Sequence, residues 1–385
     1  KIYNLIPDLS TSSIHSIWQK QLSPIKKNIL LFPSLIFVIV THNYYLCAKI
    51  KQEKRMTQSE YPSVLLIYTG GTIGMIENPE TGALEAFNFD QLQDNVPELK
   101  RFNYRISSYQ FNPPIDSSDM EPALWAKLVK IIKYNYDNFD GFVILHGTDT
   151  MAYTASALSF MLENLSKPVI LTGSQLPIGM LRTDGKENLI TSIEIAAAKH
   201  PNGTAIVPEV CIFFENHLLR GNRTTKINAE NFNAFRSYNF PSLATAGIHI
   251  KYEYDRIHKA DPNLPLKPHY LYDTNVIILT LFPGIQENMI SNILHTPGLR
   301  AVVLKTYGSG NAPQKPWFIE LLRDATSRGR YETGLHLLDA GVISGYDSTV
   351  ESVLTKLMFL LGHGKSEREI RYQMSIPVAG EFTKS

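Results

Sequence analysis

Short polar segments that follow apolar runs contain the residue types that nucleophilic hydrolysis needs. The first is Thr-Gly-Gly-Thr-Ile-Gly at residues 69–74. Its glycines, Gly71 among them, allow a sharp turn and a close approach to a ligand, and their N–H groups can bind an oxyanion. Thr72 offers a hydroxyl nucleophile. Taken alone, a Gly-Gly-Thr segment is more often only a turn.

A second segment, His-Gly-Thr-Asp-Thr, places Thr148 and Asp149 directly after another apolar run. The Asp149 carboxylate could orient a base or hold an α-amino group, although Thr and Asp are also common helix N-caps. In the third segment, residues 220–226, Lys226 follows two threonines. A threonine nucleophile needs a nearby base, and a lysine in a desolvated cleft can serve as one. The alternative for this segment is a solvated basic loop.

A fourth polar cluster, Asp116-Ser117-Ser118-Asp119, precedes Pro122. Proline suits the first turn of a helix, so the simplest interpretation of this cluster is the start of a helix. None of the four segments identifies a catalytic site by itself.

The elements that must position these segments alternate between strand and helix. Continuous apolar runs predict buried strands at residues 64–68, 142–145, 169–172 and 210–214. Helical spacing of apolar residues predicts helices that begin near residues 122, 151 and 189. Alternating strands and helices indicate an α/β fold with a parallel sheet. We therefore expect a larger N-terminal domain at residues 57–250.

A smaller, flavodoxin-like α/β domain is expected at residues 274–385, after a linker at residues 251–273 that is rich in Pro, Tyr and charged residues. The pattern predicts strands and helices in alternation here too. The expected strands are residues 276–281 and 301–304, and the expected helices are residues 286–294, 317–327 and 348–361.

The composition excludes several classes of protein. The 385 residues carry a net charge of +1 without a basic stripe, which argues against nucleic acid as a partner. The chain has two cysteines, Cys47 and Cys211, and no Cys/His spacing typical of a metal site. The apolar run at residues 29–40 contains Pro33 and is too short to span a membrane. We interpret residues 1–55 as an extension upstream of the fold, and expect a chain that starts at Met56 to be soluble and active.

Together and in this order, Thr-Gly-Gly-Thr-Ile-Gly, Asp-Ser-Ser-Asp-Met, His-Gly-Thr-Asp-Thr-Met, Thr-Gly-Ser-Gln and Gly-Asn-Arg-Thr-Thr-Lys resemble the bacterial L-asparaginase family, especially its cytoplasmic type. The resemblance covers residues 62–385. It implies hydrolysis of L-asparagine to L-aspartate and ammonia through an aspartyl ester. It also implies a cytoplasmic location, a homodimer or dimer of dimers, and no metal or other cofactor.

The resemblance also implies roles for single residues. Thr72 matches the primary nucleophile of the family, and Thr148, Asp149 and Lys226 match its second catalytic threonine with the linked carboxylate and lysine. Asp116, Ser117 and Ser118 match the positions that hold the amino and carboxylate groups of the substrate. The resemblance also implies that Gly71, Thr148 and Asp149 bind the substrate.

The chain departs from the family at two places. Residues 78–84 match a flap on which many relatives carry a tyrosine, and here they contain none, so Tyr331 is a candidate source of a hydroxyl. Near residues 329–330 the chain lacks a stretch about as long as a strand and a turn, which in cytoplasmic relatives forms part of a site for a second, regulatory asparagine. We expect regulation to be lost. We also expect residues 332–340 to be helical, and the smaller domain to lack one strand and to be less stable.

Two other functions remain open. One is the amidase subunit of a transfer-RNA-dependent amidotransferase, although residues 1–60 are too short for the extra β-barrel domain of such subunits. The other is a non-catalytic amino-acid sensor, which would not need Thr72 as a nucleophile.

Overall fold

The computed structural model describes residues 61–77, 84–86, 96–261, 263–308, 310–327, 331–333 and 340–384. Several expectations lie outside these residues. They concern the extension at residues 1–55, most of the flap at residues 78–84, and the junction at residues 328–330.

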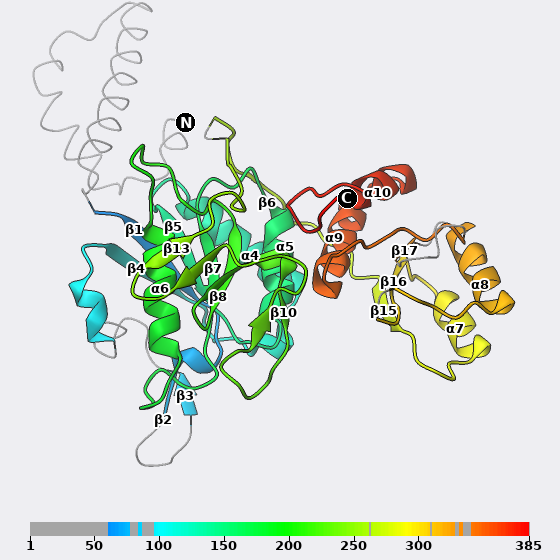
Figure 1. Cartoon of the computed structure of the whole chain (residues 1–385), viewed down its shortest axis with the longest axis horizontal. Coiled ribbons are helices and arrows are strands. Elements are labelled where there is room, and N and C mark those ends of the chain that lie inside the picture. Colours follow the sequence, from blue (N-terminus) through cyan, green and yellow to red (C-terminus); the bar gives the residue numbers. More distant parts are fainter. Residues whose placement is uncertain are drawn as a thin grey trace, which may run out of the picture. The chain divides into compact units, whose positions relative to one another are not determined.

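The larger part of the described chain is built around an eight-stranded sheet (Figure 1). Its strand order is β13-β12-β9-β8-β7-β5-β1-β4. The five strands from β8 to β4 are parallel, and the three beyond β8 are antiparallel. The strands are β1 (Ser63–Tyr68), β4 (Arg105–Gln110), β5 (Gly141–Leu145), β7 (Val169–Thr172), β8 (Val210–Phe214), β9 (His217–Arg220), β12 (Ala244–Ala246) and β13 (Ile250–Tyr252).

Every residue of β1 is buried, because helices cover both faces of the sheet. Leu65 and Ile67 face the core formed with α4 (Pro122–Asn135) and α5 (Met151–Met161). The alternate residues of β1 face the core formed with α6 (Gly185–Ala197). Side chains that alternate between two apolar layers explain why the central strands are continuous apolar runs. The predicted α/β fold is therefore confirmed.

The direction of the chain connections reverses between β1 and β5, and in an open α/β sheet such a reversal marks the crevice in which ligands bind. The chain leaves β1 toward β4 on one side, and it leaves β5 toward β7 on the other side. Loops that diverge from adjacent parallel strands leave space between them, and open α/β sheets bind ligands at such a point. The segments after β1, β4 and β5 are the ones that contain Thr72, Ser117 and Thr148.

A second parallel sheet has the order β15-β16-β17, and helices pack on both of its faces. Val302 and Leu304 lie in the core with α7 and α8, whereas Ala301 and Val303 lie in the core with α9 and α10. The elements are β15 (Val276–Thr280), β16 (Ala301–Lys305), β17 (Tyr331–Thr333), α7 (Glu287–Leu294), α8 (Pro316–Ser327), α9 (Val350–Gly362) and α10 (Glu367–Met374).

Strand β17 corrects one expectation from the sequence. It pairs in parallel with β16, with Tyr331 opposite Ala301 and Thr333 opposite Val303, so a short strand follows α8. The helix expected from residue 332 is wrong for Glu332 and Thr333. Aromatic and β-branched residues suit an extended backbone. The expectation that the smaller domain lacks a strand of the family's sheet stays a prediction. The rest of that expected helix, residues 334–339, lies outside the described residues.

Helix α9 links the two sheets. It packs against α5 of the larger part as well as against β15 and β16. Its N-cap is Thr349, whose hydroxyl accepts from the N–H of Ser352. Shorter elements complete the described chain: β2 (Met75–Glu77) with β3 (Leu84–Ala86), β6 (Leu162–Glu163) with β14 (Lys267–Pro268), β10 (Thr225–Lys226) with β11 (Phe235–Arg236), and the 3-10 turns η3 (Thr72–Gly74), η5 (Pro97–Arg101), η6 (Ser117–Asp119) and η7 (Gly221–Arg223).

The packing of α6 on the central sheet predicts that Gly141→Ala is destabilising. A methyl group at Gly141 would lie 2.1 Å from the carbonyl oxygen of Ala196, so helix and strand must separate. Overpacking of this kind costs about 1–3 kcal/mol of unfolding free energy, measured by urea denaturation. Gly247→Ala is the matched control, since the nearest atom there lies at 3.9 Å. Equal stability of the two variants would contradict the prediction.

Candidate active site

Three strand ends meet through backbone contacts at the crevice. A methyl group on Gly70 would lie 2.0 Å from the carbonyl oxygen of Ile115, and one on Gly71 would lie 2.6 Å from the Cα atom of Gly147. One on Gly147 would lie 2.5 Å from the hydroxyl oxygen of Ser117. The φ angle of Gly71 is 89°, a conformation that L residues with side chains rarely adopt. Only glycine therefore allows the loops after β1, β4 and β5 to touch.

Thr72 begins the single turn η3 and is half-buried. The N–H of Gly74 donates to the carbonyl of Gly71 at 3.2 Å and closes this turn. Beneath it lies Tyr68, whose hydroxyl donates to the carbonyl of Gly74 at 3.2 Å. Burial raises the pKa of Tyr68 to about 12, so the phenol stays protonated and keeps donating at neutral pH. Tyr68 thus supports the turn that presents Thr72, a role that its place in an apolar run conceals.

Lys226 joins the loop after β5 to the segment after β9. Its Nζ atom donates to the hydroxyl of Thr148 at 2.8 Å and to the carboxylate of Asp149 at 2.7 Å. The side chain of Lys226 is 19% exposed, whereas that of Asp149 is 65% exposed, so the cluster lies at the rim of the crevice. Lys226 and Asp149 are 77 positions apart in the chain, and only the fold brings them together.

Asp116, Ser117 and Ser118 form the loop that follows β4. The carboxylate of Asp116 accepts from both the N–H and the hydroxyl of Ser118 at 2.9 Å. These bonds, the backbone bond first, lower the pKa of Asp116 below its ordinary value. The expected helix start is therefore present as a short capped turn, η6. Ser117 is buried against Gly147, and its carbonyl accepts from the hydroxyl of Thr150 at 2.6 Å.

His146 holds the second loop from behind. One ring nitrogen, Nδ1, donates to the carbonyl of Gly147 at 2.6 Å, and Nε2 accepts from the hydroxyl of Thr154 at 3.0 Å. Trp125 donates to the same hydroxyl oxygen at 3.0 Å. In a trans peptide the N–H points away from the carbonyl, so the N–H of Thr148 points away from His146. The arrangement presents one backbone donor on the side opposite the buried ring.

The structure thus brings Thr148, Asp149 and Lys226 into direct contact, and it packs the backbone of Gly71 and the side chain of Ser117 against Gly147. The sequence assigned no role to His146, Tyr68 or Glu351. The Glu351 carboxylate accepts from the hydroxyl of Thr225 at 2.6 Å and so lies beside the residue that precedes Lys226. A signal for His146 was available, since it lies in a predicted motif. The other candidate hydroxyl, on Tyr331, belongs to a side chain outside the described part of the structure.

Comparison with known proteins identifies the family. A family model described as the asparaginase N-terminal domain matches residues 63–258, and one described as the glutaminase/asparaginase C-terminal domain matches residues 275–330. The chain belongs to the asparaginase family. The second match ends at Arg330, where the sequence analysis placed the departure from the family pattern.

Individual relatives of this asparaginase-family protein cover most of the chain. L-asparaginase 1 of Escherichia coli is 43% identical over 351 residues, which are 83% of this chain and 98% of the relative. The human 60 kDa lysophospholipase is 40% identical, over 83% of this chain and 61% of the relative. The crystal structure of L-asparaginase I from Vibrio cholerae superposes with a TM-score of 0.77 at 41% identity, and covers 84% of this chain and all of the relative.

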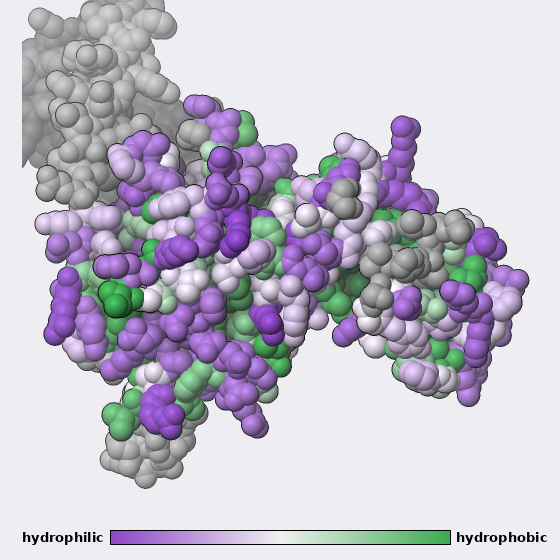
Figure 2. Space-filling view, viewed as in Figure 1, coloured by the Kyte–Doolittle hydropathy of each residue, from purple (hydrophilic) through white to green (hydrophobic). Residues whose placement is uncertain are grey.

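The described residues outside these loops contain few features that suggest a ligand. Among them, no cluster of His, Cys, Asp and Glu could hold a metal ion, and no helix is long and apolar enough to cross a membrane. A cavity of about 470 Å³ lies near Thr225 and is lined by Arg223, Lys305 and Glu351, but not by Thr72 or Thr148. On the face shown in Figure 2, hydrophilic side chains predominate and the apolar ones lie in small groups.

Burial of His146 predicts a loss of stability in acid. Desolvation lowers its pKa from 6.5 to about 4, so protons bind the unfolded chain more tightly. The contribution of His146 to the unfolding free energy is complete above its pKa in the unfolded chain. It is lost as the pH falls toward its pKa in the folded protein. From about pH 8 to about pH 5 the unfolding free energy should fall by about 2 kcal/mol from this residue.

The measurement is urea denaturation of the wild type and of His146→Gln at both pH values. The variant should lose this part of the pH dependence, while His249→Gln, which removes an exposed histidine, should keep it. An unchanged pH dependence in His146→Gln would show that other groups cause it.

Proposed function

We propose that this protein hydrolyses the side-chain amide of L-asparagine to give L-aspartate and ammonia, with Thr72 as the nucleophile. The observation that carries the proposal is the contact of Lys226 with Thr148 and Asp149 beside the Gly-Gly-Thr turn. It occurs at the carboxyl ends of parallel strands, in a chain of the asparaginase family. A hydroxyl nucleophile, a second hydroxyl and a lysine on neighbouring loops suit acyl transfer.

In the first step the hydroxyl oxygen of Thr72 attacks the carboxamide carbon of asparagine. The hydroxyl proton passes to the amide nitrogen, the carbon–nitrogen bond breaks, and ammonia leaves. An aspartyl ester on Thr72 remains. The negative charge that develops on the substrate oxygen is stabilised by the backbone N–H groups of Gly71 and Thr148. Loss of one such donor typically costs about 3–4 kcal/mol of transition-state stabilisation.

In the second step water attacks the ester carbon and restores the Thr72 hydroxyl. Thr148, Asp149 and Lys226 form a connected set of hydrogen bonds that accepts a proton from the water and returns it to the Thr72 oxygen. General-base assistance of this kind contributes about 10²–10⁴-fold. Neither step calls for a metal or an organic cofactor.

The loop after β4 binds the α-amino and α-carboxylate groups of the substrate. The Asp116 carboxylate, with its lowered pKa, remains ionised to pair with an ammonium group. The hydroxyls of Ser117 and Ser118 can donate to a carboxylate. We further propose that the protein acts in the cytoplasm as a homodimer or a dimer of dimers.

Release of ammonia from free L-asparagine by the purified protein tests the proposal, with transfer RNA present or absent. Turnover that is independent of transfer RNA is expected. Turnover that requires transfer RNA would assign the protein to the amidotransferases, and binding without turnover would make it a sensor. A parallel preparation without residues 1–55 shows whether that extension matters for the activity.

Thr72→Ala should abolish turnover and leave the fold intact, because the hydroxyl supplies the bond to the acyl group. Ammonia release should fall by at least about 10⁴-fold, while thermal unfolding stays close to that of the wild type. Turnover at the wild-type rate would rule Thr72 out as the nucleophile.

Lys226→Met should lower kcat by about 10²–10⁴-fold, because it keeps the length of the stem but removes the amine that bonds to Thr148. Lys226→Arg should not restore it, since a guanidinium stays protonated. Lys251→Met, at a side chain that is 80% exposed, is the control and should be fully active. An active arginine variant would mean that Lys226 contributes charge alone.

A further inference from the structure

The catalytic lysine follows a segment that is held by the end of the chain. Lys226 lies in the two-residue strand β10, whose backbone pairs with that of β11. Just before it, the side chains of Arg220, Asn222 and Arg223 are all buried. Buried polar and charged groups of this kind must be paired, and their partners therefore determine where the segment lies.

Arg220 pairs mainly with Glu209, whereas Asn222 and Arg223 have as partners two consecutive carbonyls near the C-terminus. Asn222 donates to the carbonyl of Ala379 at 2.9 Å, and Arg223 donates to that of Gly380 at 2.9 Å. Arg223 also donates to the hydroxyl of Thr383 at 2.9 Å and pairs with Asp347. Residues 378–383 are called the C-terminal clamp below. The clamp joins positions about 157 residues apart in the chain.

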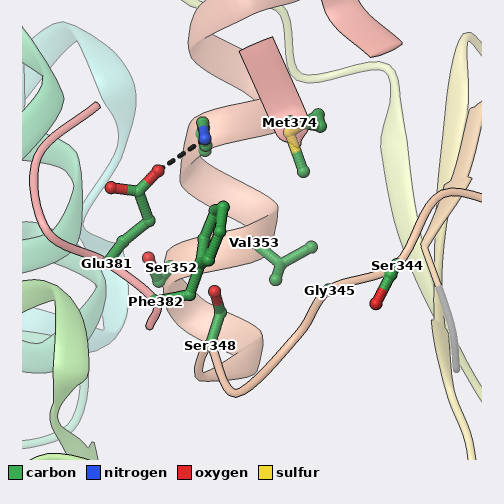
Figure 3. A pocket seen from close by; sticks show the side chains of 9 residues that line it. Ser344, Gly345, Ser348, Ser352, Val353, Met374, Glu381 and Phe382 are labelled. Atoms are coloured by element: carbon green, nitrogen blue, oxygen red, sulfur yellow. Dashed lines mark hydrogen bonds and ion pairs between the residues drawn. The ribbon is translucent and has the colours of Figure 1, made fainter. Parts of the chain in front are cut away.

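Glu381 fixes the clamp in place. Its side chain, 1% exposed, pairs with the ammonium of Lys356 on α9, which is 2% exposed (Figure 3). The same carboxylate accepts from the N–H groups of Val378 and Ala379. Nearer the start of α9, Glu351 accepts from the hydroxyl of Thr225. One helix thus holds the segment that carries Lys226 from two directions.

We propose that Glu381, through the C-terminal clamp, positions Lys226 against Thr148 and Asp149; the inference rests on the proposed function. Glu381 does not touch the substrate, and it acts through the clamp and the buried side chains of Asn222 and Arg223. Thr72 and the loop of Asp116 follow β1 and β4, which the clamp does not contact through any hydrogen bond described among residues 61–384. The clamp therefore acts on the Lys226 cluster, which serves the hydrolysis of the aspartyl ester, and not on the loop of Asp116.

Glu381→Gln leaves the Lys356 ammonium buried without its counter-charge, and the clamp must shift. The expected result is a fall in kcat of about 10-fold to 100-fold together with a lower KM, because slower hydrolysis lets the aspartyl ester accumulate. Adding Lys356→Met should restore kcat to within about threefold. The double variant removes the uncompensated charge, and the amide oxygen introduced by Glu381→Gln can still accept from the N–H of Ala379.

Leu322→Ala, in the core formed by α7 and α8, is the matched control because it lowers stability far from the clamp. Thermal unfolding identifies a temperature at which both variants are folded, and there the control should keep its kcat. An unchanged kcat in Glu381→Gln, a rise in KM, or an equal loss in the control would each overturn the proposal. So would failure of Lys356→Met to restore activity.

If the Glu381→Gln variant does not fold, the Gly380→Ala variant is tested in its place. The φ angle of Gly380 is 72°, and a methyl group would lie 2.7 Å from a guanidinium nitrogen of Arg220, so the clamp should move and kcat should fall. An unchanged kcat in that variant again overturns the proposal. Ammonia release by the wild type is measured first. An inactive wild type contradicts the proposed function, whereas an active one with insensitive variants contradicts only the role of the clamp.

Discussion

The close contact of three strand ends is the constraint on which the candidate site depends. Neighbouring parallel strands lie about 4.8 Å apart, which brings the loops after β1, β4 and β5 together. A Cβ atom on Gly70 would overlap the backbone of Ile115, and one on Gly71 would overlap that of Gly147. Glycine at these two positions therefore lets the loop after β1 contact the other two loops.

Buried polar groups behind and beside these loops determine which way they face. His146 accepts from the hydroxyl of Thr154 and donates to the carbonyl of Gly147, so the orientation of one peptide group is determined from the interior. Arg220 pairs with Glu209 in a buried ion pair. Such pairs contribute little net stability, because desolvation offsets the attraction, but breaking one is costly. Their main effect is therefore to restrict the chain to one arrangement.

Much of this architecture was accessible from the sequence, for identifiable reasons. The strands at residues 169–172 and 210–214 were predicted with their observed bounds, because strands buried on both faces are continuous apolar runs. Strand β4 was missed, since it is an edge strand whose residues are exposed or half-buried. β17 was missed because three residues give no period. The contact between Lys226 and Thr148 could not follow from local pattern, as it depends on the order of the strands.

The role of helix α9 follows from its two partners and would not be apparent from either domain alone. It packs on α5, whose first residue follows the loop of Thr148, and it also packs on β15 and β16. Through Glu351 and Lys356 the same helix holds the segment that leads to Lys226. Strand β17, beside the departure at residues 328–330, pairs with β16 of the sheet on which α9 packs. The two carboxyl–ammonium and carboxyl–hydroxyl contacts of α9, at Lys356 and Glu351, are therefore the direct route from this helix to the catalytic lysine, and neither involves the substrate.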